Sequence, residues 1–188
     1  MSHAHRWTNS SIRQNGFSLI ELMFAISVLA VGMAALLPLF ATAVLSNGKA
    51  KSDTTATMLA QTVVEKIAAQ PASAGPANLT VTDCNPAGGV QWQIATAAGA
   101  GAPLNANNEI DFTQPTVPSY NMQYMACGNN GKQTTYDVRW NVQNIAGNGN
   151  RSRVIIVAAR PAAASAVGDK NKALTFALPV TLRTIGGQ

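Results

Sequence analysis

The chain has 188 residues, a length that suits one domain with or without an appendage. Only 11% of its residues are charged and 47% are hydrophobic, which excludes a disordered chain of high charge. Its two cysteines exclude a disulfide-dense mini-protein. One stretch alone is apolar enough to cross a bilayer, so a multi-span membrane protein is also excluded. The formal net charge of +5 is modest, and no catalytic motif stands out.

The N-terminus combines a polar leader with a long apolar segment. Residues 1–16 contain two arginines and no acidic side chain, and the apolar segment begins at Phe17. From Leu22 to Gly48 no side chain is ionisable. As a helix this run would be about 40 Å long, enough to cross a hydrocarbon core of roughly 30 Å. The acid-free leader favours a cytoplasmic N-terminus, although Lys49 and Lys51 follow the apolar run.

Three interpretations of this segment compete. A secretory signal has an apolar region of about 7–15 residues, so this one is too long. A simple membrane anchor fits the length but leaves Glu21, at the start of the segment, unexplained, because a carboxylate near the membrane is costly. The third interpretation places a processing site before the apolar run, between Gly16 and Phe17.

The residues Gly16-Phe-Ser-Leu-Ile-Glu21 favour the third interpretation. They resemble the prepilin cleavage and methylation motif of type IV pilins and type II secretion pseudopilins. The resemblance implies that a membrane prepilin peptidase cuts after Gly16 and methylates the new amine on Phe17. Glu21 is then the fifth residue of the mature chain, as in that family. Pro38 becomes the twenty-second residue and matches a proline common in pilin helices.

A carboxylate at position 21 has a physical role in such a filament. An assembled pilin helix buries its apolar surface against neighbouring helices, so Glu21 would be a buried charge that must be paired or neutralised. The free amine of Phe17 on an adjacent subunit is a suitable partner. Glu21 would thereby set the axial register of assembly. The alternative is an interfacial carboxylate that snorkels to the membrane surface.

Pro38 is predicted to kink or locally open the helix, because proline lacks the backbone donor and clashes with the preceding turn. One interpretation is a melted segment that lets a filament stretch. The other is a tolerated membrane-helix proline.

Residues 49–70 are predicted to continue the helix as an amphipathic segment. Apolar side chains recur there at helical spacing, so we expect them to pack under a sheet. Pro71 follows the predicted end, and a helix over residues 17–70 would be about 80 Å long if unbroken. The stripe consists of Ala56, Leu59, Ala60, Val63 and Ile67.

Residues 71–188 are predicted to form a β-rich head. Pro115 and Pro118 argue against a central strand between residues 113 and 121. We infer an antiparallel sheet of about four strands with one face on residues 50–70, giving an α+β fold that matches the pilin architecture. The segments with strand character are Leu79–Thr82, Val90–Ile94, Tyr136–Val142, Arg153–Ala159 and Ala173–Leu182, the last interrupted at Pro179.

Four parts are therefore expected along the chain. They are a prepilin leader over 1–16, a transmembrane and polymerisation helix over 17–48, an amphipathic helix packed on the head over 49–70, and a periplasmic or extracellular head over 71–188.

The two cysteines, Cys84 and Cys127, are predicted to form a disulfide, because a secreted head favours one. Closing a loop of this length would stabilise the head by roughly 3–4 kcal/mol. The alternative is two unpaired thiols. In many major pilins the paired cysteines bracket a segment near the C-terminus, whereas both cysteines here precede the last predicted strands.

Other chemistry has little support in the sequence. Both histidines, His3 and His5, lie in the leader, so the processed chain has none for acid–base catalysis or metal binding. We predict no enzymatic activity and no cofactor. Glu109 and Asp111 share a face if their segment is a strand, and a surface pair is favoured over a catalytic or calcium site.

Basic residues concentrate towards the C-terminus. One role for these residues is to bind DNA or an anionic surface. The other is to keep a solvated sheet edge from pairing with further strands. We favour the second role, because the aromatic residues that single-strand binding needs among the basic ones are missing. Nucleic acid is therefore the less favoured partner. The residues are Arg151, Arg153, Arg160, Lys170, Lys172 and Arg183.

Within the family, Ile20–Met23 and Leu59–Ile67 resemble minor pilins of the type IV pilus modification (PilV) group. That resemblance implies a single-pass inner-membrane precursor with a periplasmic head, later assembled at the cell surface. The implied partners are prepilin peptidase, other pilins and minor pilins, the inner-membrane assembly platform, and membrane lipid before assembly. The alternatives are a major pilin, a minor pseudopilin of type II secretion in a periplasmic pseudopilus, or a single-pass anchored periplasmic protein that binds a ligand or DNA.

Overall fold

A computed structural model of the chain describes residues 16–72, 77–127, 133–145, 152–162 and 178–187. The chain divides into two units, Met1–Leu45 and Ser46–Gln188. The leader before Gly16 and the first residues of the strand predicted over Ala173–Leu182 lie outside the described residues.

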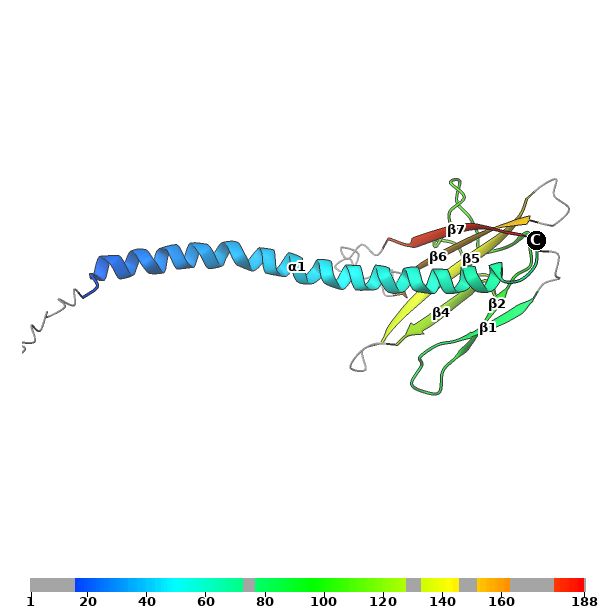
Figure 1. Ribbon diagram of the computed structural model, residues 1–188, viewed down its shortest axis with the longest axis horizontal. Helices are drawn as coiled ribbons and strands as arrows, with labels where there is room; N and C mark the ends of the chain where they lie inside the picture. The colour runs from blue at the N-terminus through cyan, green and yellow to red at the C-terminus, as the bar shows by residue number, and fades with distance from the viewer. Residues whose placement is uncertain (1–15, 73–76, 128–132, 146–151, 163–177, 188) are drawn as a thin grey trace, which may run out of the picture. The chain divides into compact units, whose positions relative to one another are not determined.

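One helix, α1 (Leu19–Ala68), contributes to both units (Figure 1). In the first unit every described residue is exposed, including the large apolar side chains of the run. Helical structure continues on both sides of Pro38. Because proline has no N–H, the carbonyl of Ala34 receives no bond from position 38, and the predicted kink stays a prediction.

The second unit is built on an antiparallel sheet of five strands, so the fold class is α+β as predicted. Strands β3, β5, β6 and β7 are neighbours in that order, and β4 pairs with β5 beside β3. A separate hairpin is formed by β1 and β2. The strands are β1 (Asn78–Thr82), β2 (Gln91–Ala95), β3 (Ala100–Gly101), β4 (Asn121–Ala126), β5 (Thr134–Asn144), β6 (Ser152–Pro161) and β7 (Val180–Gly187).

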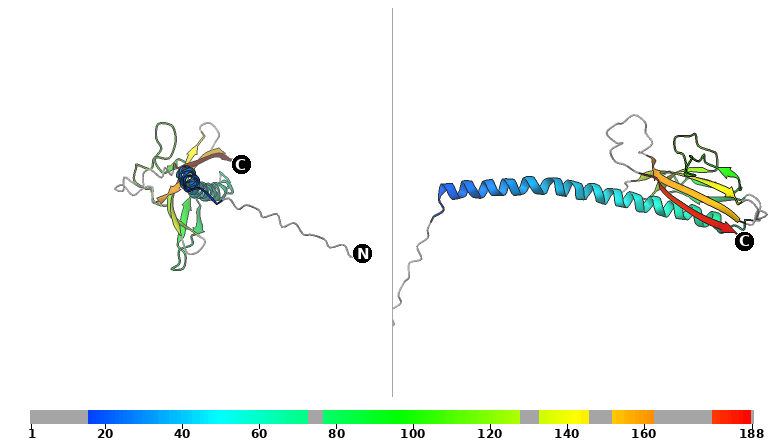
Figure 2. Two further views of the ribbon diagram at one scale, coloured as in Figure 1. Left: turned by 90° about the vertical axis from the view of Figure 1, so that its left-hand side faces the viewer. Right: turned by 90° about the horizontal axis from the view of Figure 1, so that it is seen from above.

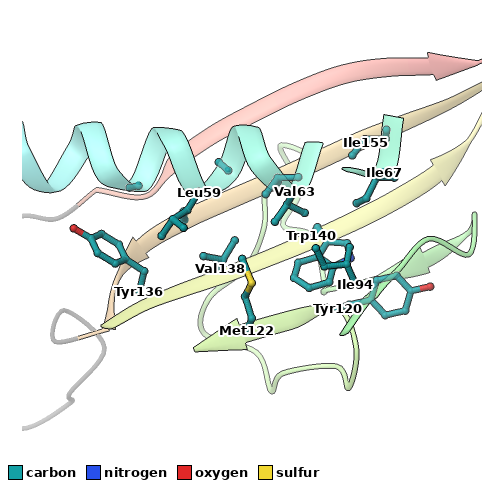
Figure 3. Packing of buried hydrophobic residues seen from close by; sticks show 14 of the residues in the cluster. Leu59, Val63, Ile67, Ile94, Tyr120, Met122, Tyr136, Val138, Trp140 and Ile155 are labelled. Carbon is teal, nitrogen blue, oxygen red and sulfur yellow. The ribbon is translucent and has the colours of Figure 1, made fainter. Parts of the chain in front are cut away.

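The second half of α1 lies along one face of this sheet (Figures 1 and 2). Its buried residues are Ala56, Leu59, Ala60, Val63 and Ile67, which confirms the predicted stripe. Because side chains alternate along a strand, every second residue of β5 and β6 meets that stripe. On the sheet the partners are Tyr136, Val138, Trp140, Val142, Ile155, Val157 and Ala159 (Figure 3).

Trp140 lies at the centre of this core and is fully buried. Its indole Nε1 donates a 3.0 Å hydrogen bond to the carbonyl of Ala95 at the end of β2. Its ring lies 6.3 Å from that of Tyr120, centroid to centroid (Figure 3). Trp140 therefore joins the main sheet to the β1–β2 hairpin as well as to the helix.

A smaller cluster covers the opposite face of the sheet. Ile156 and Ala158 of β6 meet Ala102 and Ile110 from the segment between β3 and β4. That segment is closed on itself by an antiparallel bridge between Leu104 and Ile110. The sheet is thus apolar on both faces, although its second core is much smaller than the first.

The strand predictions need two corrections. The main sheet has five strands rather than about four, because β4 and the two-residue β3 were not predicted. The strand expected over Ala173–Leu182 is described from Val180 and extends to Gly187, since it starts directly after Pro179, which cannot donate to a ladder. Pro115 and Pro118 lie outside the strands, as expected.

Gly101 allows β3 to approach β5 closely. Its φ is +147°, and a Cβ built there would lie 2.3 Å from the Cα of Asn141. We therefore expect Gly101→Ala to lower the free energy of unfolding by about 2 kcal/mol or more. Chemical denaturation followed by tryptophan fluorescence measures this loss.

Gly88→Ala provides the matched control. Gly88 also has a positive φ, +119°, but nothing lies within 4 Å of its added Cβ. Gly88→Ala therefore reports the backbone strain without the clash. Equal losses in the two variants would contradict a role for close approach at Gly101.

Candidate functional site

The start of α1 brings the predicted processing residues together. Gly16 and Phe17 precede the helix, and Phe17 is 85% exposed. The carbonyl of Ser18 accepts hydrogen bonds from the N–H groups of Glu21 (3.0 Å) and Leu22 (3.2 Å). Serine is a favoured residue at this position, because helices leave their first N–H groups without partners.

Glu21 lies in the first turn of the helix, and its side chain is exposed. A carboxylate is favoured there by the positive end of the helix dipole. Within the described parts of the chain Glu21 forms no ion pair. Its carboxylate lies four residues after Phe17, the residue that follows the predicted cleavage site.

The apolar residues that follow form the largest exposed hydrophobic surface of the described chain. Leu37, for example, is 70% exposed. Among the described residues, α1 is the one helix long and apolar enough to cross a membrane. A surface of this kind needs lipid or other helices to cover it.

Comparison with known proteins identifies the motif. Residues 12–37 match the prokaryotic N-terminal methylation motif. The matched range includes Gly16, Phe17 and Glu21. No curated protein and no solved structure matches the chain.

The head contains a disulfide between Cys84 and Cys127, whose Cα atoms lie 5.2 Å apart. It joins the segment after β1 to the end of β4. Beside it, the N–H of Cys84 donates to the carbonyl of Met125 (2.9 Å), and the Gln133 side chain donates to the carbonyl of Cys84 (2.8 Å). The bond therefore ties the β1–β2 hairpin to the edge of the main sheet.

Asp83 organises the turn next to this disulfide. Its carboxylate accepts hydrogen bonds from the N–H groups of Val90 (2.7 Å) and Asn85 (3.1 Å) and from the indole of Trp92 (3.1 Å). Burial raises the pKa of Asp83, but these hydrogen bonds outweigh it and hold the pKa below its ordinary value. The role of Asp83 is thus to close the hairpin.

A buried ion-pair network lies on the sheet face opposite α1. Asp137 pairs with Arg139 (3.1 Å) and Arg160 (3.5 Å), and both guanidinium groups lie over the ring of Phe112. The sequence did not predict this network. The available signal was the spacing of Asp137 and Arg139, which places both on one face of a strand.

The basic residues near the C-terminus do not form a surface patch where the structure describes them. Arg153 is buried and donates to the carbonyls of Ile67 and Gln70 (2.6 Å for the latter) at the end of α1. Burial lowers the pKa of Arg153. Arg183 donates to the carbonyls of Asn107 and Asn108. Arg160 belongs to the network above, and Arg151, Lys170 and Lys172 lie outside the described residues.

The carboxylates of the loop between β3 and β4 serve local turns. Glu109 accepts a weak hydrogen bond from Asn105 (3.4 Å). The hydroxyl and amide of Thr113 bind Asp111 and hold the pKa of its carboxyl below the ordinary value. In the described ranges no group of three or more His, Cys, Asp or Glu side chains could hold a metal ion.

Proposed function

We propose that the chain is a non-enzymatic minor pilin of the type IV pilus, similar to the PilV group, that primes or modifies pilus assembly. The observation that carries this proposal is the methylation motif at the start of an exposed apolar helix. The match supports the prepilin class. The minor-pilin assignment is supported by the resemblance of Leu59–Ile67 to that group.

The proposed mechanism has three steps. The precursor is inserted in the inner membrane with its N-terminus in the cytoplasm and its head in the periplasm. Prepilin peptidase then hydrolyses the bond between Gly16 and Phe17 with one water molecule. It next transfers a methyl group from a separate electrophilic methyl donor to the new amine, which releases a proton. An α-amine has a pKa of about 8, so the Phe17 amine is cationic at neutral pH. During assembly this cation pairs with the Glu21 carboxylate of a neighbouring subunit, and both charges leave the lipid and water together.

Processing is tested at the N-terminus of the cell-derived protein. We expect the mature chain to begin at Phe17 and to carry one extra methyl group, which intact-mass and N-terminal analysis will detect. Gly16→Glu should leave the precursor uncut, because the glycine supplies the cleavage site, whereas Ser10→Ala in the leader should be processed normally. A mature chain that still begins near Met1, or is cut beyond Ala30, would rule out the proposal in favour of an anchored periplasmic protein.

The minor-pilin role is separated from the alternatives by deleting the gene. A minor pilin that primes assembly should reduce the number of surface pili while secretion through the type II system continues. Loss of secretion with normal pili would identify a pseudopilin instead. A major pilin would constitute most of the protein in purified filaments.

A further inference from the structure

An open pocket of about 240 Å³ lies in the second unit, between α1 and the adjoining ends of β4 and β5. This volume is several times the roughly 30 Å³ that one water molecule occupies in the liquid. We call it the Lys51 pocket. It is lined by Gly48, Lys51, Ser52, Thr55, Ala126, Cys127, Thr134 and Tyr136.

The Lys51 pocket offers hydrogen-bond donors and one positive charge. In the described chain the ammonium of Lys51 forms no ion pair, and the hydroxyls of Ser52 and Thr134 have no hydrogen-bond partner. The other two hydroxyls are engaged: Thr55 donates to the carbonyl of Lys51 (3.0 Å), and Tyr136 donates to that of Ser52 (3.5 Å).

Among the described residues, no carboxylate lines this pocket. Three unused donors, one of them cationic, complement an anion with several acceptor oxygens, and a phosphate group has that chemistry.

The position of the pocket along the chain selects the source of the phosphate. Gly48, which lines it, is also the last residue of the run without ionisable side chains. From Leu22 to Gly48 a helix rises about 40 Å, and a bilayer with its headgroups is roughly 40–45 Å thick. Because Lys51 follows that run by only three residues, it comes to the membrane surface when the run spans the bilayer.

We propose that the Lys51 pocket binds the phosphate of an anionic phospholipid while the chain resides in the membrane. This inference rests on the proposed function, because it requires a membrane-inserted precursor. Lys51 neutralises the phosphate, and the hydroxyls of Ser52 and Thr134 bind its oxygens from opposite walls. The bound lipid holds the head at the membrane surface and is released when the chain leaves the bilayer for the filament.

The test uses the full chain in lipid nanodiscs made of phosphatidylcholine, with or without phosphatidylglycerol. Native mass spectrometry then measures how much phosphatidylglycerol stays bound to the released protein. Lys51→Gln should lower this amount about fivefold, the effect of about 1 kcal/mol for one basic residue near an anionic surface. Lys51 is exposed, so this change should leave the fold intact. Thr134→Val removes a donor from the other wall and should also lower the amount.

Lys49→Gln is the matched control. Lys49 lies within one turn of Lys51 and is exposed, but it does not line the pocket. Equal losses of bound lipid in the two variants would mean that basic residues attract the lipid without a defined site. That result, or no loss in either variant, would overturn the proposed site for a lipid phosphate. Release of the lipid by millimolar inorganic phosphate would also overturn it, because the site would then bind free phosphate. Failure of the wild-type chain to insert would overturn the proposed function itself.

Discussion

Replacing Glu21 by alanine will leave membrane insertion intact and reduce incorporation into filaments by about a hundredfold or more. In the proposed filament the Glu21 carboxylate neutralises the amine of Phe17 on the next subunit, and both are removed from water. Deleting one member of a buried ion pair costs about 3–5 kcal/mol, because the other charge stays buried without a partner. At about 1.4 kcal/mol per tenfold change, that cost exceeds a factor of a hundred in the equilibrium.

Immunoblots of sheared filaments and of the membrane fraction measure this effect as a ratio. Glu21→Gln should fail as alanine does, since a neutral amide leaves the amine unpaired. Glu65→Ala is the control, because Glu65 is an exposed carboxylate on the part of α1 that packs on the head. Normal filament levels of the Glu21→Ala variant would contradict a role in assembly and would favour a carboxylate that only meets the membrane surface.

Removing the disulfide should lower the free energy of unfolding of the head by about 4 kcal/mol. The bond closes a loop with a sequence separation of 43 residues, and the chain-entropy model gives about this value for such a loop. The loop includes the β1–β2 turn, β2, β3 and β4. Without the disulfide, this whole segment gains conformational freedom in the unfolded chain.

Denaturation curves of the wild type and of the Cys84→Ala/Cys127→Ala variant provide the measurement, with the buried Trp140 as a fluorescent reporter. Treatment of the wild type with a thiol reductant is the control and should produce a similar loss. Labelling of the untreated protein should detect no free thiol. Two reactive thiols in secreted material, or a loss below about 1 kcal/mol, would contradict the stabilising role.

The helix stripe could be predicted residue by residue because its signal is local. Ala56, Ala60 and Val63 recur at the helical period, and each is buried against the sheet. The same holds for two strands. Apolar and polar residues alternate along β5, and β6 contains a run of β-branched residues. In these elements the residues that the sequence pattern marks for the core are the ones that the structure buries.

The missed elements depend on contacts far apart in the sequence. Strand β3 has two residues and exists because Gly101 can approach Asn141 on β5. Strand β4 carries methionines and a tyrosine in place of β-branched residues, so its pairing with β5 decides its structure. The Asp137 network likewise needs Arg160 from another strand. The proposed pairing of Glu21 with an amine would need a second subunit, which one chain cannot supply.

The buried guanidinium of Arg153 has a mechanical consequence. It connects β6, a central strand, to the carbonyls of Ile67 and Gln70 where α1 ends. The attachment of the end of α1 to the sheet therefore does not depend only on the chain connection after Pro71. Two parts of the head that are more than 80 residues apart in the sequence are thus held together by one side chain.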